Sequence, residues 1–117
     1  MAIRFNPGDT RGAIVEPENY PYAPSLQLNA DALRARIILT GDIELLPPIN
    51  GVDGCSLEAW LYADGADRNL TFDTQIGLGF NLAPQPYVID AGTTYVLKMR
   101  YDGPRNLWGL DGLIDSF

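Results

Sequence analysis

Short runs of β-favouring residues alternate with clusters of turn-forming residues from about residue 30 onward. The clusters, for example 50–54 and 64–67, are rich in residues that preset a turn or tolerate a positive φ. Eight such runs without a segment that fits a crossover helix predict an all-β fold, namely an antiparallel, jelly-roll-like β-sandwich. The helical alternative is one short turn over 29–36. We expect strands over 33–40, 41–46, 55–63, 68–72, 75–78, 87–90, 93–101 and 106–113.

Two of these runs alternate strictly enough to assign their faces. Within 56–62 the residues Leu57, Ala59 and Leu61 share one face, which we assign to the core. The opposite face carries Glu58, Trp60 and Tyr62. It is either covered by the N-terminal segment or open to a partner, because amphipathic aromatic side chains are enriched at interfaces. Within 94–101 the predicted core residues are Tyr95, Leu97, Met99 and Tyr101.

Residues 1–30 have a different pattern, because four prolines and two glycines interrupt any regular element every few residues. Helix is excluded there, yet the segment is too apolar for a polar linker. We therefore predict an extended, proline-rich arm over 1–30 and a β-sandwich domain over 31–117. The arm would bury apolar side chains against its own domain or against a neighbouring subunit. Its predicted interface residues are Ile3, Phe5, Ile14, Val15, Tyr20 and Tyr22.

Composition supports one folded domain and narrows its partners. A chain of 117 residues, of which 46% are hydrophobic, can build a single compact core. Fifteen acidic against eight basic residues give a net charge of −7, so we expect neither nucleic acid nor a membrane as partner. Two groups of closely spaced cations could form a basic patch, but they are interpreted as solvated strand faces: Arg34 and Arg36, and Lys98, Arg100 and Arg105. Without a secretory signal or a membrane span, the chain is expected to be made in the cytoplasm and to stay soluble.

The inventory of reactive side chains argues against an enzyme. Without histidine and with the single cysteine Cys55, a zinc cluster, an intramolecular disulfide and histidine-based catalysis are excluded. A carboxylate pair could hydrolyse a glycoside, but the acids fall mostly in predicted turns, in the arm and at outward strand positions. Asp64, Asp67 and Asp73 could hold calcium, although a hairpin turn explains them better. We predict no catalytic residue, no metal site and no cofactor.

The segment 50–72, NGVDGCSLEAWLYADGADRNLTF, resembles a module of tailed-phage virion structural proteins. In that module an N-x-V-D-G loop leads into a strand, an A-D/S-G-A-D-R turn follows, and an L-T-F/L strand comes next. The resemblance covers about 37–117, and its most specific parts are 52–54 and 63–68. Its later features resemble 91–93, 98–101, Trp108 and the terminal Phe117.

The resemblance implies a jelly-roll-like β-sandwich that serves as a building block on capsids, tail fibres or baseplates, without an enzymatic role. One domain joined to an apolar arm favours a capsid decoration (cement) protein on the capsid surface of the virion. It would form a symmetric homo-oligomer, with a trimer as the expected order, and clamp neighbouring subunits of the major capsid protein. The alternative is a carbohydrate- or receptor-binding module of a tail fibre or adhesin, in which Trp60, Tyr62 or Trp108 stacks on sugar rings.

Overall fold

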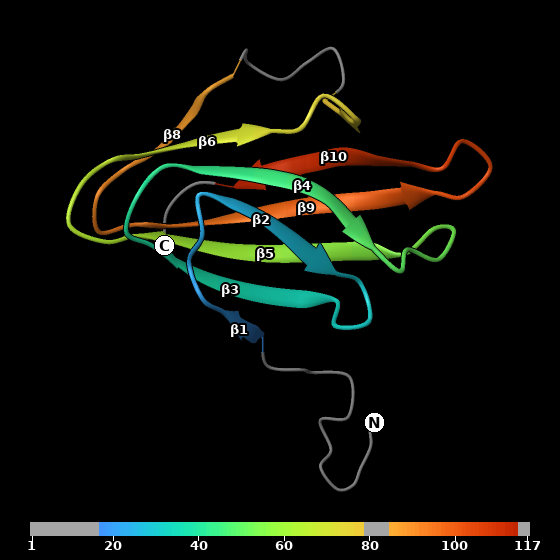
Figure 1. Cartoon of the computed structure of the whole chain (residues 1–117), viewed down its shortest axis with the longest axis horizontal. Coiled ribbons are helices and arrows are strands. Elements are labelled where there is room, and N and C mark those ends of the chain that lie inside the picture. Colours follow the sequence, from blue (N-terminus) through green and yellow to red (C-terminus); the bar gives the residue numbers. More distant parts are fainter. Residues whose placement is uncertain (1–16, 79–84, 115–117) are drawn as a thin grey trace, which may run out of the picture.

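The computed structural model describes residues 17–78 and 85–114, and within them it contains strands and turns but no helix. The predicted all-β class is therefore confirmed. Each of the eight predicted runs overlaps one strand, β3 to β10, and two further strands precede them. The strands labelled in Figure 1 are β1 (Glu18–Tyr20), β2 (Ser25–Asn29), β3 (Arg34–Leu39), β4 (Ile43–Ile49), β5 (Ser56–Ala63), β6 (Arg68–Phe72), β7 (Ile76–Gly77), β8 (Tyr87–Ile89), β9 (Thr94–Asp102) and β10 (Leu107–Ile114).

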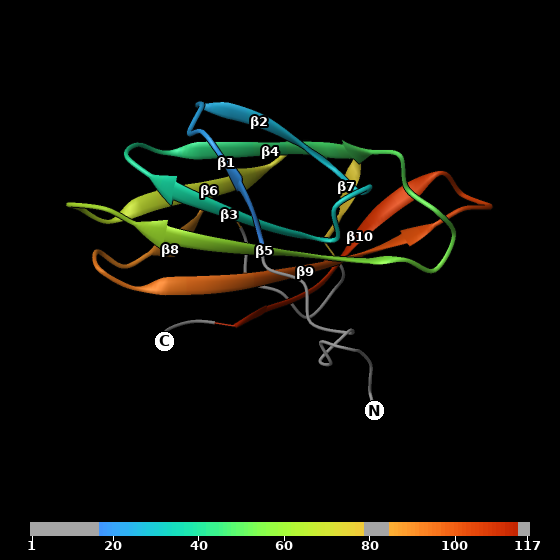
Figure 2. The same ribbon diagram turned by 90° about the horizontal axis from the view of Figure 1, so that it is seen from below.

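These ten strands form two mixed sheets, whose layers are separated in Figure 2, with β2 and β4 above β5 and β9. The larger sheet has the order β1-β3-β5-β9-β10-β7, and the smaller has the order β2-β4-β6-β8. Consecutive strands from β1 to β9 alternate between the two sheets. As a result, β1, β3 and β5 are parallel neighbours in one sheet, and β2, β4 and β6 are parallel neighbours in the other.

The prediction of an antiparallel fold is therefore wrong. In the described part of the chain, antiparallel pairing is confined to β5 with β9, β9 with β10 and β6 with β8. A parallel neighbour needs a return connection, which is usually a helix. Here the chain returns as a strand of the opposite sheet, so the lack of a crossover helix did not imply antiparallel neighbours.

The hydrophobic core lies between the sheets and draws side chains from both. The predicted inward faces of β5 and β9 are confirmed except at Tyr101, which is half-buried and packs on Trp108 with the ring centroids 5.1 Å apart. The inward residues that are at most 8% exposed are Leu57, Ala59, Leu61, Tyr95, Leu97 and Met99. The smaller sheet contributes Leu28, Ile43, Leu45, Leu70, Phe72 and Ile89.

Strand β4 continues through two prolines that lie beyond the predicted run of 41–46. Strand β6 pairs only with residues 43–45, and β2 pairs with residues 44–46 and 49, so neither Pro47 nor Pro48 has a register partner on either side and their missing N–H groups cost no ladder hydrogen bond. Both proline carbonyls accept side-chain hydrogen bonds, from Gln27 Nε2 at 2.8 Å and from Trp108 Nε1 at 3.0 Å. The prolines thus extend the strand instead of ending it.

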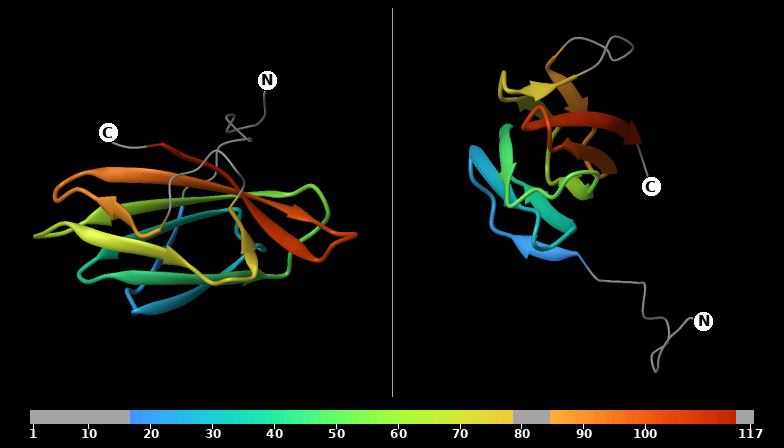
Figure 3. Two further views of the ribbon diagram at one scale, coloured as in Figure 1. Left: turned by 90° about the horizontal axis from the view of Figure 1, so that it is seen from above. Right: turned by 90° about the vertical axis from the view of Figure 1, so that its right-hand side faces the viewer.

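Residues 17–30, which the sequence analysis placed in the arm, belong to the domain's own sheets. Strand β1 pairs with β3 at one edge of the larger sheet, as the end-on view of Figure 3 shows, and β2 pairs with β4. Tyr20 Oη accepts a hydrogen bond from the backbone N of Asn29 at 3.0 Å, and Tyr22 Oη donates to the carbonyl of Asp42 at 2.6 Å. These two predicted arm residues therefore contact their own domain.

The rest of the predicted arm lies outside the described residues. This holds for the predicted interface residues Ile3, Phe5, Ile14 and Val15.

Candidate functional site

One face of the larger sheet points away from the core and brings together the aromatic residues singled out in the sequence. On β3, β5 and β9 the outward residues occupy alternate positions, and the cross-strand register aligns them in three rows. We call this surface the outer face. Its rows are Arg34–Glu58–Lys98, Arg36–Trp60–Val96 and Ile38–Tyr62–Thr94.

The first row is a charge network centred on Glu58. Oε1 of Glu58 accepts hydrogen bonds from Arg34 Nε at 3.2 Å, from Arg34 Nη2 at 3.1 Å and from Trp60 Nε1 at 2.7 Å. Partial burial raises the pKa of Glu58, but the hydrogen bonds from Trp60 and Arg34 and the charges of Arg34 and Lys98 outweigh it, so this pKa lies below its usual 4.5. Glu58 is therefore ionised at neutral pH and holds the indole in place.

The second row places two cations beside one indole. The guanidinium carbon of Arg36 lies 5.5 Å from the centroid of the Trp60 ring, and that of Arg34 lies 5.8 Å from it, both within cation–π range. Arg34 is paired with Glu58, whereas no carboxylate of the described residues lies within ion-pair distance of Arg36. The row thus presents, among these residues, a guanidinium without a carboxylate partner next to an aromatic ring.

The third row is apolar and carries hydroxyl groups. Ile38 is 52% exposed and Tyr62 is 36% exposed, so this end of the outer face leaves apolar area in water. A shallow hollow of about 160 Å³ is lined by Arg36, Trp60, Tyr62 and Thr94. No hydrogen bond between described residues engages the side-chain hydroxyl of Tyr62 or of Thr94. Two hydroxyl groups, one cation and one indole therefore meet in the hollow.

The structure places Trp60 and Tyr62 side by side on this face, as the alternation along β5 predicted. Sequence reasoning did not connect Arg36 or Thr94 with them, because the register of β3 and β9 brings these residues in. The available signal was the spacing of the cations along β3, which was interpreted as a solvated strand face. Trp108, the third aromatic residue considered for sugar stacking, is 3% exposed and lies in the core.

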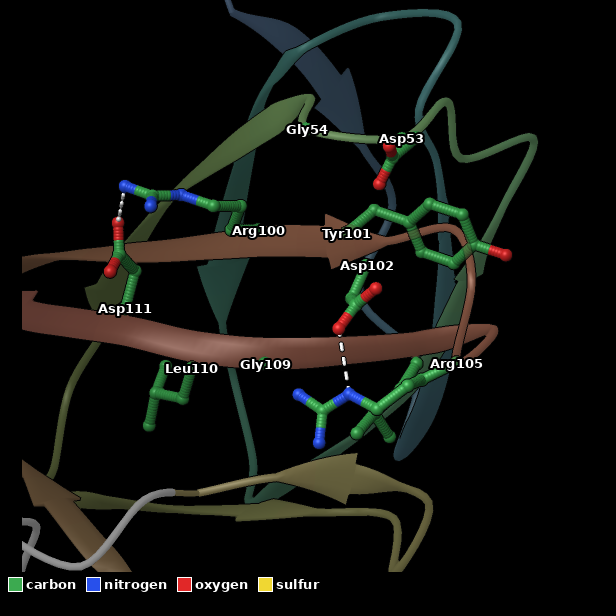
Figure 4. A pocket seen from close by; sticks show the side chains of 10 residues that line it. Asp53, Gly54, Arg100, Tyr101, Asp102, Arg105, Gly109, Leu110 and Asp111 are labelled. Carbon is green, nitrogen blue, oxygen red and sulfur yellow. Dashed lines mark hydrogen bonds and ion pairs between the residues drawn. The ribbon is translucent and has the colours of Figure 1, made fainter.

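A larger hollow, of about 370 Å³, lies against the β9–β10 hairpin and the turn before β5 (Figure 4). Both of its guanidinium groups have carboxylate partners: Arg100 pairs with Asp111 at 2.9 Å and Arg105 with Asp102 at 2.6 Å. The hydrogen bond from Arg105 holds the pKa of Asp102 below its usual value. Because each cation is already paired, this hollow attracts an anion less than the one beside Arg36.

The carboxylates and the cysteine form no metal centre within residues 17–78 and 85–114, since no three such side chains gather there. Two aspartates considered for calcium make local contacts. Asp67 Oδ1 accepts from the backbone N of Ala91 at 2.8 Å, and the carbonyl of Asp64 accepts from Arg68. Cys55 is half-buried. A helix able to cross a membrane is not found in the described part of the chain.

Comparisons with protein-family models and with curated proteins find no match to this chain. The fold and the outer face define it as an all-β domain with a cationic surface that carries aromatic side chains. Its function has to be argued from this surface and from the loops that join the sheets.

Proposed function

We propose that the chain is a structural protein of a tailed-phage virion. In this proposal it is a capsid decoration (cement) protein that binds the major capsid protein as a homo-oligomer, with a trimer as the expected order. The resemblance of residues 50–72 to virion modules supports it. We also propose that the two layers form a jelly-roll-like β-sandwich. The parallel strand neighbours differ from the antiparallel pairing of an ordinary jelly roll.

The observation that carries the proposal concerns residues 52–54, the most specific part of the resemblance. Asp53 Oδ1 accepts a hydrogen bond from the backbone N of Gly103 at 2.8 Å and so ties the loop to the β9–β10 hairpin. Gly54 has a φ of 82°, which favours glycine. Val52 is aliphatic yet 70% exposed, so its side chain adds little to the stability of the monomer. Its side chain is accessible for contact with another molecule, which is the role that this proposal gives it.

Two other aliphatic side chains lie at the same end of the molecule. Leu33 is 47% exposed and Ile49 is 44% exposed. Their segments, at the β2–β3 and β4–β5 connections, lie on one side of Figure 1 and are joined by a hydrogen bond from Ala30 N to the carbonyl of Ile49 at 2.9 Å. We call Leu33, Ile49 and Val52 the loop end. Full burial of an exposed side chain of this kind contributes about 1.5–3 kcal/mol. These three are 44–70% exposed, so a contact over all of them would contribute roughly half of the full sum toward the cost of association.

In this proposal fewer arm residues clamp the neighbouring subunits than the sequence predicted. Tyr20 and Tyr22 are engaged within the domain, so they are not offered to a neighbouring subunit. The contact assigned to Ile3, Phe5, Ile14 and Val15 stays a prediction.

The test is whether Val52 controls assembly and binding to the shell. Val52→Asp should weaken oligomerisation by about tenfold or more, because each 1.4 kcal/mol corresponds to a factor of ten. Val88→Asp is the matched control, since Val88 is 47% exposed but lies on the edge strand β8 of the smaller sheet. Size-exclusion chromatography with light scattering measures the oligomer, and immunogold electron microscopy locates the protein on intact particles. A monomer that is absent from the particles would overturn the proposal.

One observation favours a second function, binding of a carbohydrate or a receptor. The hollow beside Trp60 lies toward the end of β5 that leads into the 64–67 turn, whereas the loop end precedes the start of β5. One protein can therefore use the loop end for assembly and the outer face for a ligand. A glycan array probed with the wild-type chain and with Trp60→Ala tests this function. An array without hits removes it.

A further inference from the structure

The outer face concentrates positive charge in an acidic protein. Among the described residues, Glu58 pairs with Arg34 and Asp111 pairs with Arg100, while Arg36 and Lys98 have no ion-pair partner. Of these last two, only Arg36 lines the hollow beside Trp60. A ligand that enters the hollow therefore meets a guanidinium that no described carboxylate neutralises, and a planar guanidinium pairs best with a carboxylate or a phosphate. Three of the chain's eight lysines and arginines stand on the outer face, namely Arg34, Arg36 and Lys98, and a fourth, Arg100, follows next to it on β9.

The other lining residues favour a sugar ring as the carrier of the anion. The rings of Trp60 and Tyr62 line the hollow and bring apolar surface that suits C–H groups. No hydrogen bond between described residues engages the hydroxyls of Tyr62 and Thr94, which suits the hydroxyls of a ligand. A sugar ring supplies both the C–H groups and the hydroxyls that match them. A peptide carboxylate would pair with Arg36 and leave these hydroxyls unused.

The size of the hollow limits the ligand to one ring. Its volume of about 160 Å³ is small beside the roughly 300–1,000 Å³ of a typical ligand pocket. One ring therefore fits, and the rest of a longer polysaccharide stays outside. This matches the recognition of a terminal or side-branch unit.

From this arrangement we infer that the hollow is a binding site for a carboxylate-bearing monosaccharide unit, such as a uronic or sialic acid of a cell-surface polysaccharide. Arg36 pairs with the carboxylate, Trp60 packs against the ring, and Tyr62 and Thr94 bond the ring hydroxyls. Glu58 is a positioning residue, because its hydrogen bond to Nε1 holds the indole. The inference rests on the carbohydrate-binding function proposed above and is independent of the virion proposal.

The two tryptophans of the chain provide a reporter for this site. Trp60 Nε1 donates to Glu58 on the outer face, whereas Trp108 Nε1 donates to the Pro48 carbonyl in the core, so their indole N–H signals in a nitrogen–proton correlation NMR spectrum report on separate places. The probes are methyl β-glucuronide and N-acetylneuraminic acid, with methyl β-glucoside as the neutral control and acetate as a carboxylate without a ring. We expect the acidic sugars to shift the Trp60 signal alone, with a dissociation constant of about 1 mM, and both controls to bind about tenfold more weakly or worse.

Two variants test the role of the guanidinium. Arg36→Gln should abolish the preference for acidic sugars, and an unchanged Trp108 signal shows that this variant is folded. Arg105→Gln is the matched control, because it removes a guanidinium that is paired with Asp102 elsewhere, and it should leave the preference intact.

Three results would contradict the inference in distinguishable ways. If the glucoside binds as well as the glucuronide and Arg36→Gln has no effect, the acidic-sugar site is wrong while carbohydrate binding stands. If acetate or an oligoglutamate peptide shifts the Trp60 signal as strongly as the acidic sugars, the site recognises carboxylates without a ring. If no sugar shifts this signal even at sugar concentrations well above about 1 mM, both the inference and the carbohydrate-binding function fail. The virion proposal is then unaffected.

Discussion

The packing of Tyr22 over Gly41 decides whether residues 17–30 belong to the domain in solution. Tyr22 Oη donates to the Asp42 carbonyl at 2.6 Å, and a Cβ added to Gly41 would overlap this hydroxyl and lie 3.1 Å from Tyr22 Cζ. Gly41→Ala should therefore destabilise the fold by about 1–3 kcal/mol through overpacking. Tyr22→Phe removes the hydrogen bond, at a cost of about 0.5–1.5 kcal/mol. It also removes the worst overlap, so Gly41→Ala should cost about 1 kcal/mol less in the Tyr22→Phe background.

Urea unfolding of the wild type, the two single variants and the double variant measures this coupling, and equal m-values show that the unfolded states are comparable. Gly112→Ala is the matched control, because a Cβ there meets nothing within 4 Å, and its effect should not depend on residue 22. If Gly41→Ala costs the same in both backgrounds, within about 0.5 kcal/mol, Tyr22 does not pack over Gly41. The assignment of residues 17–30 to the domain would then rest on the pairing of β1 and β2 without the side-chain packing that anchors them.

Three further predictions test the core, a turn and the charge network. Leu61→Ala removes a side chain that is 0% exposed and should lower the free energy of unfolding by about 2–5 kcal/mol; a loss below about 1 kcal/mol in urea unfolding would contradict the core assignment. Gly54→Ala places a side chain at a φ of 82° with nothing within 4 Å, so its cost, about 1–2 kcal/mol by the same measurement, should be purely conformational, and Gly54→Asn should cost less. Because the folded pKa of Glu58 lies below its usual 4.5, its ionised form stabilises the fold above that pH and this contribution is lost as the pH falls through the folded pKa. Thermal unfolding across this pH range should therefore show a smaller acid-induced loss of stability in Glu58→Gln than in the wild type, and equal losses would show that Glu58 is not held as described.

Local patterns were sufficient to predict most strands and their faces. The inward set of β5 follows from the side-chain period of two, which needs only neighbouring residues. The turns that flank this strand contain Gly54 and Gly65, with φ values of 82° and 83°, and such positions are recognisable from glycine and aspartate alone. Each of these features depends on a few consecutive residues, so one sequence was enough to find them.

The pairing of the strands could not be predicted in this way. A strand has the same local pattern whether its successor joins the same sheet or the opposite one, so the alternation between sheets left no signal. Proline misled the prediction for a related reason. Pro17, Pro21 and Pro24 flank β1 and β2 without interrupting them, and both are edge strands, where the missing N–H is tolerated. A proline-rich stretch was therefore compatible with two strands.

The candidate site also has a part that local patterns could predict and a part that they could not. Trp60 and Tyr62 were predictable as neighbours because they stand two residues apart on one strand. Arg36 and Thr94 stand on other strands, and only the parallel register of β3 with β5 and the antiparallel register of β5 with β9 bring them to the hollow. Chemistry that needs residues from three strands has no local signature, so the sequence showed the aromatic half of the site and not the cation.

The net charge of −7 predicts that the average surface repels anionic partners. The outer face is an exception, because its local charge is positive. Exposed charges act over a Debye length of about 8–10 Å at ordinary ionic strength. Arg34, Arg36 and Lys98 on the outer face and Arg100 beside it on β9 stand against two acids, Glu58 and Asp111, so the local balance is positive. A phosphate backbone carries one charge every few ångströms and would extend from this face over the surrounding acids. A single sugar carboxylate would meet Arg36 alone, so binding of a small anion is compatible with exclusion of nucleic acid.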